Sequence, residues 1–120
     1  MSTRSAQIER LRTRIEKLKQ QILELDLIVS GTLARRTKVC GKPGCRCATD
    51  PEARHGPYYE WGRIEAGRRT TTTVSPEKGR RLRVALRNQR RLKNLVRRWE
   101  RESVRLLDAE IAASHAQGAR

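Results

Sequence analysis

The sequence has very little large apolar volume from which to build a core. Among its 120 residues there is no phenylalanine, and tryptophan and tyrosine occur only 2 times each. Hydrophobic residues make up 36% of the chain and charged residues 34%. A chain this short and this polar generally needs an additional stabilising element, such as a bound metal ion, long helix–helix packing or a partner. We expect one small domain with an extended helical part.

The chain is also poor in acidic residues and has no long apolar run. Its 28 basic and 13 acidic residues give a net charge of +15, which favours an anionic partner such as nucleic acid. No segment approaches the roughly 20 apolar residues that cross a bilayer. The N-terminal residues contain no apolar signal core. We expect a soluble cytoplasmic protein, associated with the nucleoid and without a membrane partner.

Cysteine is confined to one place, where Cys40, Cys45 and Cys47 are followed by His55. An odd number of cysteines in a reducing compartment argues against a disulfide framework. The spacing C-x4-C-x-C-x7-H offers three thiolates and one imidazole, which are ligands that Zn²⁺ takes in tetrahedral sites. We predict that Cys40, Cys45, Cys47 and His55 bind a structural Zn²⁺ ion, which would supply folding free energy.

Two other interpretations of the cysteine cluster stay open. The thiols could remain reduced without a metal, with His55 packing beside Gly56 and Pro57. Alternatively, basic neighbours could activate one thiol as a redox group or nucleophile, although no second histidine or carboxylate is evidently placed as its base. A catalytic carboxylate pair, a phosphate-binding glycine-rich loop and a Ser/His/Asp arrangement are not visible. We therefore expect a protein that is not an enzyme.

Residues 5–30 show the heptad pattern of a packed helix. The apolar seam consists of Ile8, Leu11, Ile15, Leu18, Ile22, Leu25 and Val29. Such 3-4 spacing allows either a homodimeric coiled coil or packing against a second helix of the same chain. Arg12, Arg14 and Lys19 flank the seam and would place like charges together in a parallel dimer. We therefore favour the intramolecular interpretation.

Residues 31–74 predict a small antiparallel β-head. Thr32–Val39, Tyr58–Ile64 and Arg69–Val74 are rich in strand-forming residues, and Glu65-Ala66-Gly67 is a plausible turn. The cysteine loop then lies before the hairpin. The head also contains Tyr58, Tyr59 and Trp61. We expect these aromatic rings to pack the head rather than to stack on bases.

Residues 75–113 predict a second, basic helix. Ser75 is a suitable N-cap and Pro76 suits the first turn. We expect a frayed tail over residues 114–120. The apolar stripe consists of Leu82, Ala85, Leu92, Val96, Trp99 and Leu106. If it packs on the first helix, the longer helix should leave an overhang near Leu106, Leu107 and Ile111 for a partner or another copy.

The fold class that follows is α+β and mainly α. We expect two long antiparallel helices in a coiled-coil-like hairpin, with a small zinc-stapled antiparallel β-head.

Arginines dominate the opposite face of the second helix and the tip of the hairpin. Arginine pairs with phosphate through two parallel hydrogen bonds. The predicted nucleic-acid-binding residues are Arg63, Arg68, Arg69, Arg80, Arg83, Arg87, Arg90, Arg91, Arg97, Arg98, Arg101 and Arg105. A basic stripe can equally be a solvated helix face.

From these arginines we predict a nucleic-acid-binding accessory or regulatory protein. We favour DNA over RNA, and a mobile element or phage as the setting. The alternative is an adaptor that docks by its coiled coil onto a larger protein or nucleoprotein complex.

Three motifs together resemble a family of small, basic, uncharacterised prokaryotic proteins with a CGKxxCxC…HGPYY signature. The matching segments are 40–47 (CGKPGCRC), 55–59 (HGPYY) and the helix entry at 74–77 (VSPE). The resemblance covers about residues 31–105 and leaves the heptad helix outside. It implies that the cysteine–histidine head is the defining unit of the family, and it implies no activity.

Overall fold

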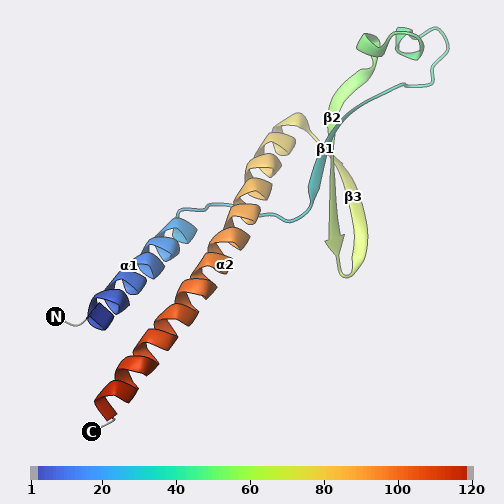
Figure 1. The fold of residues 1–120 in the computed structure, drawn as a ribbon. Coiled ribbons are helices and arrows are strands. Elements are labelled where there is room, and N and C mark those ends of the chain that lie inside the picture. Colours follow the sequence, from blue (N-terminus) through green and yellow to red (C-terminus); the bar gives the residue numbers. More distant parts are fainter. Residues whose placement is uncertain (1–2, 119–120) are drawn as a thin grey trace. The chain divides into compact units, whose positions relative to one another are not determined.

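The computed structural model describes residues 3–118 (Figure 1). Its main elements are α1 (Thr3–Leu23), β1 (Thr32–Lys38), β2 (His55–Glu65), β3 (Arg68–Val74) and α2 (Pro76–Gly118). The chain forms two compact units, one made of residues up to Asp26 and from Asn88 onward, the other of Leu27–Arg87. The prediction of a mainly helical chain with a small antiparallel sheet is confirmed. Within residues 3–118, neither helix combines the length and apolar character needed to cross a membrane.

The first unit is held by apolar contacts between α1 and the C-terminal half of α2. Its core contains Leu11 and Ile15 from α1 with Leu106 and Ala109 from α2, and Ile8 and Trp99 pack against it. Polar pairs flank this core. Arg12 contacts Glu110 at 2.9 Å, Arg14 contacts Glu102 at 3.7 Å, and Arg91 donates to Gln21 at 3.2 Å. The basic residues that flank the heptad seam therefore have acidic partners within the chain.

The buried stripe of α2 in this unit differs from the predicted one. Leu95 is the most deeply buried side chain, with 1% exposure, whereas the predicted Leu92 and Val96 are only half-buried. The stripe runs through Leu95, Trp99, Glu102, Leu106 and Ala109. At about 100° per residue, Leu95 lies about 140° around the helix from Leu82. A stripe extrapolated from Leu82 therefore misses the residues that face α1.

One residue of the predicted α2 overhang, Leu106, does not overhang. Leu106 is buried in the core with α1, while Leu107 and Ile111 stay exposed. The reason is that α1 reaches far along α2, since the Arg4 guanidinium donates to the carbonyl oxygen of Ala112 at 3.2 Å.

The first helix is shorter than the heptad pattern predicts. It ends at Leu23 rather than residue 30, so Leu25 and Val29 lie beyond it. Val29 instead packs against the core of the second unit, and its backbone N–H donates to the carbonyl oxygen of Ala85 at 3.2 Å. Tertiary packing of this extended segment overrides the local 3-4 spacing. The remaining predicted seam residue, Ile22, is half-buried near the end of α1.

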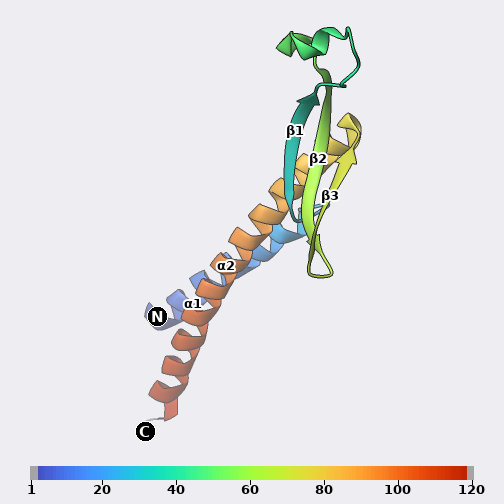
Figure 2. The same ribbon diagram turned by 90° about the vertical axis from the view of Figure 1, so that its right-hand side faces the viewer.

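The second unit contains a three-stranded antiparallel sheet with β2 in the centre (Figure 2). Trp61 in β2 lies opposite Leu33 in β1 and Thr72 in β3. Tyr59, Val74 and Leu82 form the core, with Leu33, Trp61 and Val29 packed around it. The predicted turn is confirmed, because Ala66 and Gly67 both have positive φ, at 50° and 77°. Strand β2 begins at His55, three residues earlier than predicted, since His55 pairs with Lys38.

The long helix begins as predicted and ends later. The Ser75 hydroxyl accepts a hydrogen bond from the Lys78 backbone N–H at 3.1 Å, which confirms the N-cap. The helix continues to Gly118 instead of ending at residue 113. Residues 114–118 of the expected frayed tail are therefore helical, and residues 119–120 lie outside the described residues.

Close packing of α2 on the sheet requires a glycine at position 79. A β-carbon there would lie 2.5 Å from Cδ2 and 2.7 Å from Cγ of the Tyr59 ring. We predict that Gly79→Ala lowers the free energy of unfolding by about 1–3 kcal/mol, because the ring or the helix must shift. The control is Gly118→Ala, since a β-carbon there meets nothing within 4 Å. Urea unfolding checks both, and equal midpoints for Gly79→Ala and wild type would contradict the close approach.

Candidate metal centre and nucleic-acid interface

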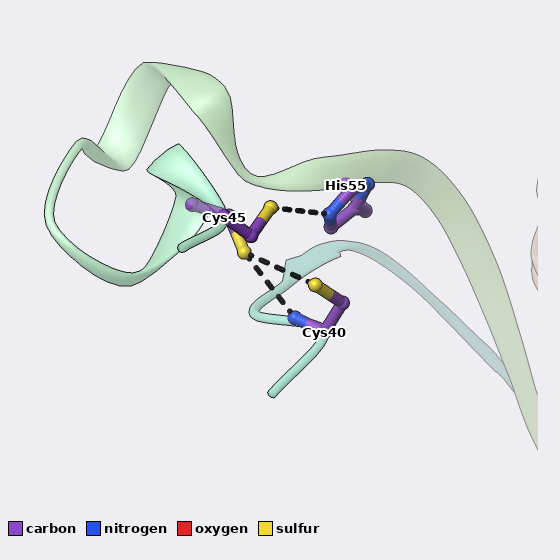
Figure 3. Close-up of side chains that lie close together, drawn as sticks. Cys40, Cys45 and His55 are labelled. Atoms are coloured by element: carbon purple, nitrogen blue, oxygen red, sulfur yellow. Dashed lines mark hydrogen bonds between the residues drawn. The ribbon is translucent and has the colours of Figure 1, made fainter. Parts of the chain in front are cut away.

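The four predicted ligands lie together at one end of the β1–β2 pair. The thiol sulfurs of Cys40, Cys45 and Cys47 and a ring nitrogen of His55 all lie within 4.8 Å of one another. Cys40 Sγ is 3.5 Å from Cys47 Sγ, and Cys45 Sγ is 3.4 Å from His55 Nε2. Figure 3 shows the labelled side chains of Cys40, Cys45 and His55 converging on one small volume. The structure therefore brings together all four residues singled out from the sequence.

The loop that carries the thiols has the backbone expected of a tight ligand loop. Gly41 and Gly44 have φ values of 78° and 79°, which favour glycine. Cys47 lies in a short 3₁₀ turn, η1 (Arg46–Ala48), and a second turn, η2 (Pro51–Ala53), leads back to His55. Turns of this kind reverse the chain within a few residues. The three thiols can therefore face inward although they lie within only eight residues of the sequence.

The interpretation of the sequence missed Asp50, which organises this loop. Its carboxylate accepts from the Glu52 backbone N–H at 3.0 Å and lies 3.2 Å from the Arg46 guanidinium. The signal was present, because Asp before Pro favours a turn closed by the aspartate side chain.

The thiols influence one another's ionisation. The backbone N–H of Cys47, followed by the thiols of Cys47 and Cys40, lowers the pKa of Cys45. At Cys47 the backbone N–H of Cys40 has the largest single influence and lowers the pKa. Hydrogen bonding with Cys45, burial, and the Cys40 thiol together outweigh it, so the pKa of Cys47 is raised. Such mutual effects are expected when thiols share one small volume.

The donor set and its spacing fit one tetrahedral ion. With metal–sulfur bonds of about 2.3 Å, tetrahedral geometry places neighbouring sulfurs about 3.8 Å apart. The observed separations of 3.4 Å and 3.5 Å, and the 4.8 Å limit for the whole set, are close to this value. Cys47 is 2% exposed, and the other two thiols are half-buried. The four residues could therefore hold a metal ion with little rearrangement.

Basic residues flank the cluster in the sequence. Lys42 and Arg54 are exposed, and within residues 3–118 neither forms a hydrogen bond or ion pair. Lys38 lies 5.5 Å from the centre of the Tyr58 ring. Three thiolates and one divalent ion would carry a net charge of −1, which these cations can offset.

One predicted nucleic-acid-binding arginine has a different position. The side chain of Arg63 is only 13% exposed, and its guanidinium lies 3.9 Å from the centre of the Trp61 ring. It also donates to the Thr72 hydroxyl at 2.7 Å and to Glu65 at 2.8 Å. All its contacts are internal to the second unit. Arg63 is therefore held by contacts within the second unit, and its assignment to a phosphate-binding surface stays a prediction that these contacts do not favour.

The other predicted arginines are exposed. Arg83 lies over the Tyr59 ring at 5.6 Å, Arg91 donates to Gln21, and Arg105 contacts Glu102 at 3.5 Å. Among the residues that the structure describes, the following arginines have no hydrogen-bond or ion-pair partner: Arg68, Arg69, Arg80, Arg87, Arg90, Arg97, Arg98 and Arg101.

The aromatic residues of the head lie on both faces of β2. Tyr59 is buried and Trp61 packs beside it, as predicted. The indole N–H of Trp61 donates to the Ser30 carbonyl oxygen at 3.1 Å. Tyr58 lies on the opposite face of β2 and is half-buried.

Removal of one ligand should release the ion. We predict about one metal ion per chain in the wild type and in His115→Ala, and clearly less in His55→Ala and Cys45→Ser, by elemental analysis after dialysis. His115→Ala is the matched control because it removes the other histidine, on α2. If His55→Ala retains the full metal content, His55 is not a ligand.

Comparison with known proteins identifies the family. A protein-family model described as "Domain of unknown function (DUF6788)" matches residues 8–84. The match begins within α1, so the expectation that the heptad helix lies outside the family is wrong, whereas the C-terminal half of α2 lies beyond the match. Neither the curated proteins nor the solved structures contain a match to the chain. Because the family model covers well over half of the sequence, the chain belongs to the family of unknown function DUF6788.

Proposed function

We propose that this protein is a non-enzymatic nucleic-acid-binding accessory or regulatory protein with a structural Zn²⁺ site. The observation that carries the proposal is the set of exposed arginines on α2 that lack partners within residues 3–118. Arginine side chains in contact only with water are available to phosphate. When such side chains neutralise phosphates, the counterions condensed on the nucleic acid are released, and this release would supply binding free energy.

The acidic residues of the chain strengthen this argument. Several of them, including Glu60, Glu102 and Glu110, already contact a basic residue of the same unit. They therefore do not neutralise Arg87, Arg90 or Arg97. An unneutralised row of guanidinium groups produces a positive potential that attracts polyanions.

DNA is the favoured target. A single exposed helix can enter the major groove of B-form DNA or follow its backbone. The major groove of A-form RNA is deep and narrow and does not admit side chains in the same way.

Zn²⁺ is the favoured ion, with His55 as its fourth ligand. A set of three thiolates and one imidazole is typical of structural zinc and leaves no open position for substrate. Structural zinc would also explain how a head with few large apolar residues folds. The further proposal that α1 and α2 form a helical hairpin is supported by the core that they share and by the polar pairs that flank it.

A second candidate function is that of a protein-interaction adaptor. Val104, Leu107 and Ile111 are spaced at 3 and 4 residues on α2 and are 56%, 60% and 55% exposed. An apolar stripe of this kind suits a partner helix. A homodimer formed through this stripe is compatible with nucleic-acid binding.

The proposal predicts duplex DNA binding that depends steeply on salt. We expect Arg90→Gln/Arg97→Gln to weaken binding at least tenfold and to reduce the slope of log K against log salt by about 2, since two phosphate contacts are lost. Fluorescence anisotropy with a plain duplex at several salt concentrations measures both quantities.

The matched control is Arg10→Gln/Lys93→Gln, which removes the same charge from exposed positions outside the predicted set. It should change the affinity much less. If the wild type does not bind duplex DNA at low salt, the nucleic-acid function is wrong, and the adaptor function is preferred.

A further inference from the structure

A small basic cavity lies between the two helices of the first unit. Its volume is about 150 Å³. The lining residues are Arg14, Lys17, Leu18 and Gln21 from α1 and Arg98, Arg101 and Glu102 from α2. We call this cavity the α1–α2 notch. Its lining contains four cationic side chains and one carboxylate.

The carboxylate of Glu102 does not neutralise the whole notch. Oε2 of Glu102 is buried, has no hydrogen bond among the described residues, and lies 3.7 Å from Arg14 Nη1. Its Oε1 lies 3.5 Å from the Arg105 guanidinium. Glu102 therefore engages Arg14 on one side and Arg105 on the other. Because Oε2 is inaccessible, a bound anion would not meet it directly.

Three cations of the notch remain available for a ligand. Lys17, Arg98 and Arg101 are exposed and have no hydrogen-bond or ion-pair partner within residues 3–118. Gln21 accepts from Arg91 through its carbonyl oxygen, which leaves its amide N–H₂ free to donate. Cations and amide donors from two helices therefore face one volume. Such a set can surround the oxygens of one anion.

We propose that the α1–α2 notch binds a single phosphate group, with Lys17, Arg98, Arg101 and Gln21 as its ligands. The proposal deepens the nucleic-acid-binding function and rests on it for the source of the phosphate. It adds residues of α1 to a binding surface that was predicted from the sequence only for α2 and the β2–β3 hairpin. The guanidinium forks of Arg98 and Arg101 suit phosphate oxygens, and Lys17 supplies a point charge.

The size of the notch suits a small anion. Its volume of about 150 Å³ accommodates one tetrahedral oxyanion. A phosphodiester of a nucleic-acid backbone and a terminal phosphate monoester both present such a group, and the tests below distinguish these two sources.

The first test uses inorganic phosphate and does not depend on nucleic acid. Isothermal titration calorimetry at low ionic strength should detect phosphate binding to the wild type and to Lys93→Gln, and at least fivefold weaker binding to Lys17→Gln. Lys93→Gln is the matched control, because Lys93 is an exposed lysine of the same unit that does not line the notch. Equal phosphate affinity in the two variants would overturn the proposal.

The second test identifies the source of the phosphate. Lys17→Gln should reduce the salt slope of duplex binding by about 1 relative to Lys93→Gln. A 5′-phosphorylated duplex and a 5′-hydroxyl duplex are compared with each protein. Tighter binding of the phosphorylated duplex by the wild type, lost in Lys17→Gln, assigns the notch to a terminal monoester. Equal binding of both duplexes, with the reduced slope, assigns it to a backbone phosphodiester.

The two tests separate the failure of the notch from the failure of the function. Phosphate binding that depends on Lys17, without any duplex binding, supports the notch and refutes the nucleic-acid function. Salt-dependent duplex binding that is unaffected by Lys17→Gln supports the function and refutes the notch. Circular dichroism of both variants should match that of the wild type, since Lys17 and Lys93 are exposed.

Discussion

Both hydrophobic clusters of the described residues draw on the same helix, and the rest of the structure depends on this shared use of α2. Leu82 packs with Tyr59 and Val74 in the second unit, and Leu106 packs with Leu11 and Ile15 in the first. A chain of 120 residues without phenylalanine has little large apolar volume for two independent cores. One long helix that contributes residues to two small cores reduces the apolar volume that the fold requires.

This arrangement explains where the charge lies. Because each part of α2 buries only part of its circumference, the remaining positions can carry arginine without a desolvation cost. Acidic residues such as Glu102 and Glu110 approach α1, where they pair with Arg14 and Arg12. Exposed ion pairs contribute little stability, and median values are about 0–1 kcal/mol. The main effect of these pairs is therefore to fix the position of α1 along α2. Most of the arginines of α2 stay outside such pairs.

The cysteine–histidine cluster lies in a loop that has few buried apolar residues to stabilise it. The loop between β1 and β2 contains only one fully buried apolar residue among those described, Cys47. Apolar burial therefore contributes little to fixing the positions of the three thiols. The contacts of Asp50 with Glu52 and Arg46 fix part of the loop. A coordinated ion would supply the remainder, because its binding free energy becomes folding free energy. The same loop carries exposed cations, so the metal centre would also orient part of the basic surface.

The sequence by itself determined the features that depend on neighbours along the chain. The cluster of cysteines with His55, the Ser75 cap and the Ala66-Gly67 turn all follow from local spacing and backbone preference. Tertiary structure alone decided that α1 ends at Leu23, that Leu95 is the most deeply buried residue of α2, and that Arg63 packs against Trp61. It also brought Lys17 beside Arg98. These outcomes depend on which residues distant in sequence come into contact. Helical periodicity specifies a face of a helix but neither the partner it meets nor the register of the contact.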